Sequence, residues 1–170
     1  MVECQKCLDP TAFGLFLVAV VSLPLAVLQL WQPEGFNWLP TNEFFMLIGA
    51  LIIAVAFLAY RSDSNFGFVV FGLVGAAVFM TGFSAPDFMQ NITFGLVFIL
   101  AIIWSIFAKT PKNLTLILVT TALVFLFVGF WVYDGSDWWH WLIGLAALFN
   151  FIFNIYLAYA LALDGKIPVF

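Results

Sequence analysis

Long runs of uncharged residues are the feature of this sequence that most constrains its fold. Six runs contain no Asp, Glu, Lys or Arg: Ala12–Leu30, Phe44–Tyr60, Phe66–Phe83, Ile92–Phe107, Leu114–Val132 and His140–Leu163. A helix needs about 20 apolar residues to cross the hydrocarbon core of a bilayer. The strands of a membrane barrel alternate polar and apolar residues over about ten positions, and these runs hold too few polar residues for that. The sequence therefore predicts an all-α polytopic membrane protein with six transmembrane helices.

Composition excludes several other classes of protein. Hydrophobic residues make up 65% of the chain and charged residues 8%, against roughly 45–50% and about 25% in soluble globular domains. Five Lys and Arg residues cannot form the clustered basic face that binds nucleic acid, and the high hydrophobicity excludes disorder. We expect one transmembrane domain over residues 12–163, with short cytoplasmic tails over residues 1–11 and 164–170.

The charged residues set the expected orientation. All the basic residues fall on segments that six spans place on one side of the membrane: Lys6, Arg61, Lys109, Lys112 and Lys166. The other side carries only acidic residues: Glu34, Glu43, Asp87, Asp134 and Asp137. Because basic loops stay in the cytoplasm, we expect both termini on the cytoplasmic side of a cell membrane.

Few residues of this sequence could carry out catalysis or bind a metal. An enzyme needs a nucleophile with a base, a metal cluster or paired carboxylates, and the predicted spans contain no acidic residue and one histidine, His140. Cys4 and Cys7 form a Cys-x-x-Cys pair in the N-terminal tail, without the second pair or thioredoxin-like context that redox or metal sites normally have. Two reduced thiols are the simpler interpretation. We expect no enzyme activity, cofactor or metal.

Uncharged hydrogen-bonding residues remain as candidates for a site. Thr120 and Thr121 lie in the middle of the fifth span, and Asn150 and Asn154 in the middle of the sixth. The two asparagines are four residues apart and share one helix face. A buried amide needs a partner or water, so this face either lines a polar pathway or holds helices together through hydrogen bonds. The sequence leaves both interpretations open.

Three short motifs resemble those of a known family. Asp9–Leu15 (Asp-Pro-Thr-Ala-Phe-Gly-Leu) is similar to the signature Asn-Pro-Ala-Pro-Leu-Gly-Leu. Ala59–Gly67 (Ala-Tyr-Arg-Ser-Asp-Ser-Asn-Phe-Gly) is similar to Glu-Tyr-x-x-Gly-Asn-Thr-Phe-Gly, and Tyr156–Ala158 with Gly165–Pro168 is similar to the end of the sixth span. In these motifs the sequence resembles the acetate uptake transporter family, the small succinate–acetate permease proteins of microbes.

The resemblance implies a set of pathway residues. Members of the family form hexamers, and each protomer has its own pore, narrowed by aromatic and aliphatic side chains of spans 1, 3 and 5. Those positions fall on Val18, Val74 and Thr121, and a pore-lining position of the sixth span falls on Asn154. Aromatic side chains are absent at these positions. The pore is therefore wider, or another aromatic side chain closes it, such as Phe16 or Phe71.

The function that we expect is a channel or transporter for acetate and related small monocarboxylates, linked to protons or passing the neutral acid. Its partners would be the carboxylate, membrane lipid and further copies of the chain in a homohexamer. Two alternatives stay open: a channel for small neutral solutes of the urea or amide type, and a membrane scaffold subunit that transports nothing.

Overall fold

Six helices make up the part of the chain that the computed structural model describes, which is residues 10–31, 41–163 and 168–169. They are α1 (Thr11–Trp31), α2 (Asn42–Arg61), α3 (Asn65–Phe83), α4 (Phe88–Phe107), α5 (Lys112–Asp134) and α6 (Trp138–Ala162). At about 1.5 Å per residue they are about 28–38 Å long, enough for a hydrocarbon core of about 30 Å. The prediction of six helices that are long and apolar enough to cross a membrane is confirmed.

Five of these helices begin and end within two residues of the predicted spans, and α4 begins four residues earlier than predicted. The reason is a helix cap. The Asp87 carboxylate accepts a hydrogen bond from the backbone N–H of Gln90 at 2.9 Å, which satisfies one of the free N–H groups of the first turn. Gln90 and Asn91 therefore lie inside the helix rather than in a loop. Cys4 and Cys7 lie outside the described residues.

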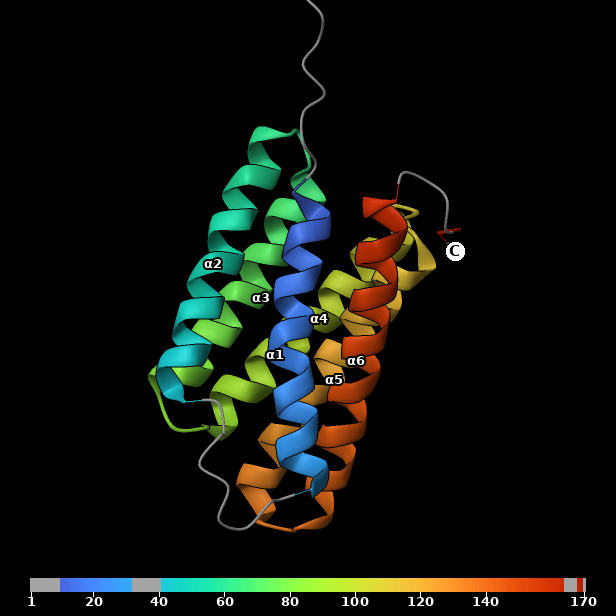
Figure 1. Ribbon diagram of the computed structural model, residues 1–170. Coiled ribbons are helices and arrows are strands. Elements are labelled where there is room, and N and C mark those ends of the chain that lie inside the picture. Colours follow the sequence, from blue (N-terminus) through green and yellow to red (C-terminus); the bar gives the residue numbers. More distant parts are fainter. Residues whose placement is uncertain (1–9, 32–40, 164–167, 170) are drawn as a thin grey trace, which may run out of the picture.

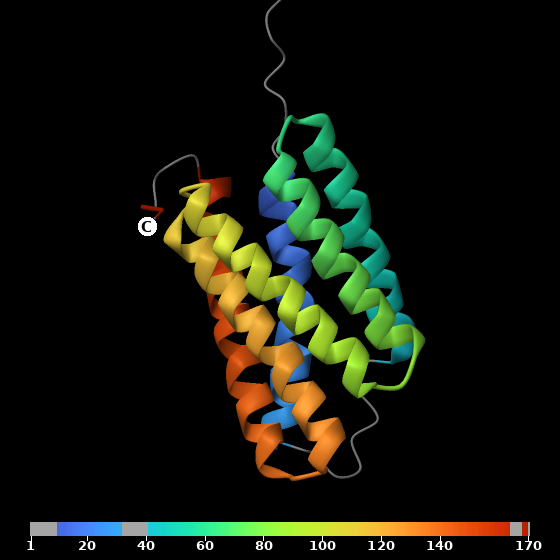
Figure 2. The same cartoon turned by 180° about the vertical axis from the view of Figure 1, so that it is seen from behind.

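The six helices form two groups, with α1 between them (Figure 1). On one side α2 and α3 pack against each other; on the other, α6 packs against α1, and α5 packs against both α6 and α4. The consecutive helices α3 and α4 make little contact, and Figure 2 shows them diverging from the turn that joins them. α3 also makes few direct contacts with α1, so packed side chains fill the interior between these helices.

Glycines give α2 and α3 their close contact. A Cβ added at Gly49 would lie 2.5 Å from the backbone nitrogen of Phe79, and one at Gly75 would lie 2.8 Å from the backbone nitrogen of Ile53. Both distances are too short for any real side chain, so only glycine fits. Small residues at such positions let membrane helices approach closely. This closely packed pair forms one wall of the bundle.

The charged residues of the described chain lie at its two ends. The end where α1 begins and α6 ends, called the basic end here, carries Arg61, Lys109 and Lys112 with Asp63. The opposite, acidic end carries Glu43, Asp87, Asp134 and Asp137. Alternating helices therefore bring together the loops of like charge that the sequence places on each side.

Candidate functional site

Two cavities inside the bundle share part of their lining. The larger has a volume of about 100 Å³ and is lined by residues of all six helices and of the α3–α4 turn. The smaller has a volume of about 80 Å³. Val18 of α1 and Val74 of α3 line both cavities. Since about 10–15 Å³ of such volume holds one water, each cavity has room for several waters or one small solute.

The two cavities extend toward opposite ends of the bundle. The larger reaches Ser84 and Pro86 in the α3–α4 turn, at the acidic end. The smaller reaches Thr11, the first residue of α1, and Ser64, the residue before α3, at the basic end. Together the cavities follow most of the length of the bundle, and their shared lining residues Val18 and Val74 lie between them.

The lining contains no ionisable side chain among the residues that the structure describes. Most of it is apolar, and its polar groups are amides and hydroxyls. A mostly apolar pocket with a few convergent polar groups is typical of small-molecule sites. The chemistry that this lining offers is therefore hydrogen bonding and van der Waals contact, without a fixed charge.

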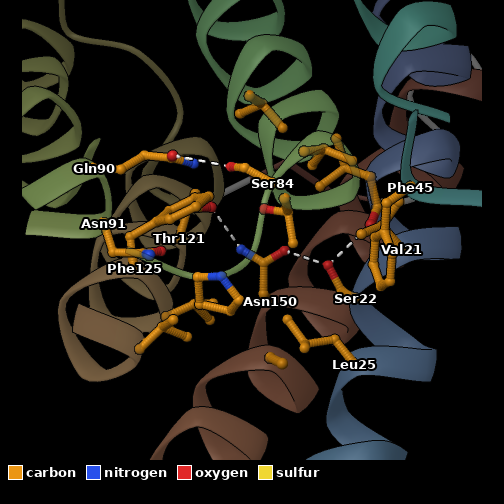
Figure 3. Close-up of a pocket in the computed structure, with 18 residues that line it drawn as sticks. Val21, Ser22, Leu25, Phe45, Ser84, Gln90, Asn91, Thr121, Phe125 and Asn150 are labelled. Carbon is orange, nitrogen blue, oxygen red and sulfur yellow. Dashed lines mark hydrogen bonds between the residues drawn. The ribbon is translucent and has the colours of Figure 1, made fainter. Parts of the chain in front are cut away.

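Asn150 joins three helices at the edge of the larger cavity (Figure 3). Its Nδ2 donates to the Ile117 carbonyl at 3.1 Å and to the hydroxyls of Thr120 and Thr121 at 2.9 and 2.8 Å. Its Oδ1 accepts from the Ser22 hydroxyl of α1 at 2.8 Å. Because Asn150 is buried, these bonds replace the water that the amide loses on burial.

Asn154 extends this network by one turn of α6. Its Nδ2 donates to the backbone carbonyl of Asn150 at 2.8 Å and to Asn150 Oδ1 at 2.9 Å. Asn154 lines the smaller cavity and Asn150 the larger. The two asparagines thus link the linings of the two cavities. The two interpretations that the sequence leaves open are not exclusive, because the same amides line the cavities and bond helices together.

Six of the seven predicted pathway residues line at least one cavity: Val18, Phe71, Val74, Thr121, Asn150 and Asn154. Phe16 lines neither. Its ring packs edge-on against the ring of Tyr159, with centroids 5.4 Å apart. Two residues along a helix turn a side chain by about 200°, so Phe16 faces away from the side that carries Val18. Of the two aromatic candidates for closing the pore, only Phe71 reaches a cavity.

The sequence prediction missed the lining that comes from the α3–α4 junction. Ser84, Gln90 and Asn91 line the larger cavity, and the Ser84 hydroxyl donates to Gln90 Oε1 at 3.3 Å (Figure 3). Polar residues at the expected end of a span look like ordinary loop residues. The signal that could have identified them is Asp87, since an acidic residue just before a helical stretch is a helix-start signal.

A known membrane channel has this architecture. The solved structure of the bacterial acetate channel SatP matches with a TM-score of 0.84, covering 95% of this chain and 98% of that chain, at 15% sequence identity. No family model matches the sequence, and neither does any curated protein. The resemblance that the sequence motifs indicate is confirmed at the level of the fold.

The hydrogen-bond network predicts different costs for two substitutions. Ser22→Ala removes one hydroxyl from the network, so we expect the free energy of unfolding to fall by about 0.5–1 kcal/mol. Asn150→Leu removes the side chain that joins α6 to both α1 and α5, and it should lower the free energy of unfolding by about 2–3 kcal/mol. Reversible unfolding of the purified protein in mixed micelles measures both values. Equal losses of unfolding free energy, or a larger loss for Ser22→Ala, would show that Asn150 is not the centre of the network.

Proposed function

We propose that this chain is a membrane channel or transporter for acetate and related small monocarboxylates, and that it belongs to the acetate uptake transporter family. The observation that carries the proposal is the pair of uncharged cavities that meet at Val18 and Val74 along the length of the bundle. The likeness to the fold of an acetate channel and the three sequence motifs support the same substrate class. The chain moves the solute and does not alter it.

The lining favours the neutral acid over its anion. Burying an ionised group without an opposite charge costs far more than burying its neutral form, and no described lining residue is cationic. The neutral acid needs only hydrogen-bond partners and an apolar surface. Under about 1% of a carboxylic acid with the pKa of Glu is neutral at pH 7. Permeation is therefore linked to a proton that the acid takes up on one side and releases on the other.

The acidic end of the bundle is suited to the entry of an acid. Four exposed acidic residues lie there: Glu43, Asp87, Asp134 and Asp137. Their negative potential attracts protons and repels the carboxylate anion, over a range that salt limits to about 8–10 Å. Entry at this end favours the protonated solute.

The assembly that we propose is a homohexamer in a cell membrane, with both termini in the cytoplasm and one transmembrane domain over residues 12–163. The basic end faces the cytoplasm, as the distribution of Lys and Arg favours. Large apolar side chains are exposed on the outside of the bundle, such as Leu47, Leu100 and Ile106. Exposed apolar side chains of this kind fit lipid and neighbouring copies of the chain.

A channel for small neutral solutes is the second candidate. The same uncharged lining favours it, and urea or a simple amide offers N–H donors where a carboxylic acid offers one O–H. The two functions differ in their response to pH. The flux of a neutral amide is independent of pH, whereas the flux of a weak acid follows its neutral fraction.

Single cysteines test the proposed orientation. In a background where Ser replaces Cys4 and Cys7, an impermeant thiol reagent should label Asp87→Cys and Asp137→Cys on intact cells. Lys112→Cys should react only after the membrane is permeabilised. All three native side chains are exposed, so accessibility within the protein does not limit the reaction. Labelling of Lys112→Cys on intact cells would contradict the orientation.

The neutral-acid mechanism predicts that acetate flux rises as the external pH falls. The neutral fraction of an acid with a pKa near 4.5 grows roughly tenfold per pH unit between about pH 7 and pH 5. Uptake of labelled acetate into proteoliposomes, corrected for leak through protein-free vesicles, measures this. A protein-dependent flux that is flat with pH would show that the anion itself permeates.

His140→Gln is the control for a contribution of the protein to this pH dependence. His140 bonds to Gln29, and its ring lies 5.1 Å from that of Trp131 between centroids. It lies in the first turn of α6, near the acidic end. Because the titrating group of the mechanism is the solute, we expect the variant to keep most of the rise in flux.

A further inference from the structure

The donors of the Asn150–Asn154 amide pair are committed to acceptors inside the protein. Two backbone carbonyls fix the orientation of these amides, since a carbonyl can only accept. The Ile117 carbonyl lies 3.1 Å from Asn150 Nδ2, and the Asn150 carbonyl lies 2.8 Å from Asn154 Nδ2. The identity of the nitrogen and oxygen ends is therefore set by geometry. Each NH₂ group of the pair points back into the protein.

The hydroxyls around this pair are committed in the same way. Thr121 donates to the carbonyl four residues earlier on α5 at 2.8 Å, and Thr120 donates to the carbonyls three and four residues earlier at 3.0 Å. The Ser22 hydroxyl lies 2.9 Å from the Val18 carbonyl and 2.8 Å from Asn150 Oδ1, which are both acceptors. No hydrogen of these groups is left for a solute.

One acceptor of the network is left over. Asn154 is fully buried, and within the described chain its Oδ1 has no hydrogen-bond partner. A buried polar atom without a partner costs about 1–3 kcal/mol, and the large majority of such atoms in proteins are paired. Asn154 lines the smaller cavity, which shares Val18 and Val74 with the larger. The unpaired oxygen thus belongs to a residue of the pathway.

We propose that Asn154 Oδ1 binds the hydrogen-bond donor of the permeating solute, which for a carboxylic acid is its O–H. The proposal rests on the proposed function and deepens it, because it assigns the discrimination between acid and anion to one atom. A carboxylate has only acceptors, so at this site it meets an oxygen that repels it, and the donors of the surrounding asparagines, threonines and Ser22 are already committed. The neutral acid donates its O–H to Oδ1 and places its apolar part against Val18 and Val74.

Asn113 provides a matched control. It is also fully buried, and neither of its side-chain polar atoms has a partner in the described part of the chain. It lies in the first turn of α5 and lines neither cavity. Asn113→Leu therefore removes an unpaired buried amide and leaves the pathway unchanged, whereas Asn154→Leu removes the proposed acceptor.

The first experiment measures acetate flux at external pH 5 in proteoliposomes with the parent, Asn154→Leu or Asn113→Leu. We expect Asn154→Leu to lower the protein-dependent flux about tenfold, as for the loss of one hydrogen bond to a buried group. Asn113→Leu should keep the parent flux. Parent-like flux in folded Asn154→Leu would overturn the proposal and leave the proposed function intact. Absence of flux in the parent itself at any pH would instead contradict the proposed function.

Infrared spectroscopy tests the same contact without depending on the folding of Asn154→Leu. In Asn113→Leu with ¹³C-labelled asparagine side chains, acetic acid at pH 5 should shift an amide carbonyl band to lower frequency, because that carbonyl gains a hydrogen bond. Acetamide, which is neutral and has N–H donors, should cause the shift at pH 5 and pH 8. Acetate at pH 8 should cause none. No shift with acetic acid, or an equal shift with the anion, would contradict the proposal.

Discussion

The cost of an unpaired polar group away from water is the constraint on which this structure depends. In a bilayer no water reaches the lipid-facing backbone, so helices that satisfy their own hydrogen bonds are one of the few ways to cross it. The same cost acts inside the bundle. Asn150, buried at 3% exposure, is held by Ile117 and two threonine hydroxyls of α5 and by Ser22 of α1, and so ties α1, α5 and α6 together. On the other side of the bundle, α2 and α3 are held together by the close contact at their glycines.

In the proposed channel, that hydrogen bonding also decides which solutes the cavity lining can bind. Hydrogens that hold the helices together are not available to a solute, so a stable bundle leaves a lining that is poor in donors. The apolar share of the lining, with Val18 and Val74 at its centre, gives no compensation for the lost hydration of an anion. In the channel that we propose, stability and selectivity thus have the same physical origin, and both favour a small neutral solute.

The sequence predicts the fold well, because a span is a local property. The absence of charge over 16 or more residues gives the number of helices. The one helix start that it predicts wrongly by more than two residues is that of α4, which Asp87 caps. Partners are not a local property. The sequence places Asn150 and Asn154 on one face, but the bonds of Asn150 to residues 29–33 and 128 positions away follow only from tertiary packing. The sequence also does not show which of its many aromatic residues face the interior. Phe16 is a candidate pore residue by sequence, but tertiary packing places its ring against Tyr159.

The proposed function requires solute to pass between the two cavities at Val18 and Val74, and substitutions of two valines of α1 test this passage. Val18 is 6% exposed and lines both cavities, whereas Val20 is 46% exposed on the outside of the bundle. Acetate uptake at pH 5 into proteoliposomes of equal protein content compares Val18→Phe with Val20→Phe, after both are shown to be folded. We expect acetate uptake by Val18→Phe to fall to the protein-free leak, and uptake by Val20→Phe to keep the parent rate. Parent-rate uptake by folded Val18→Phe would contradict the proposed passage between the cavities.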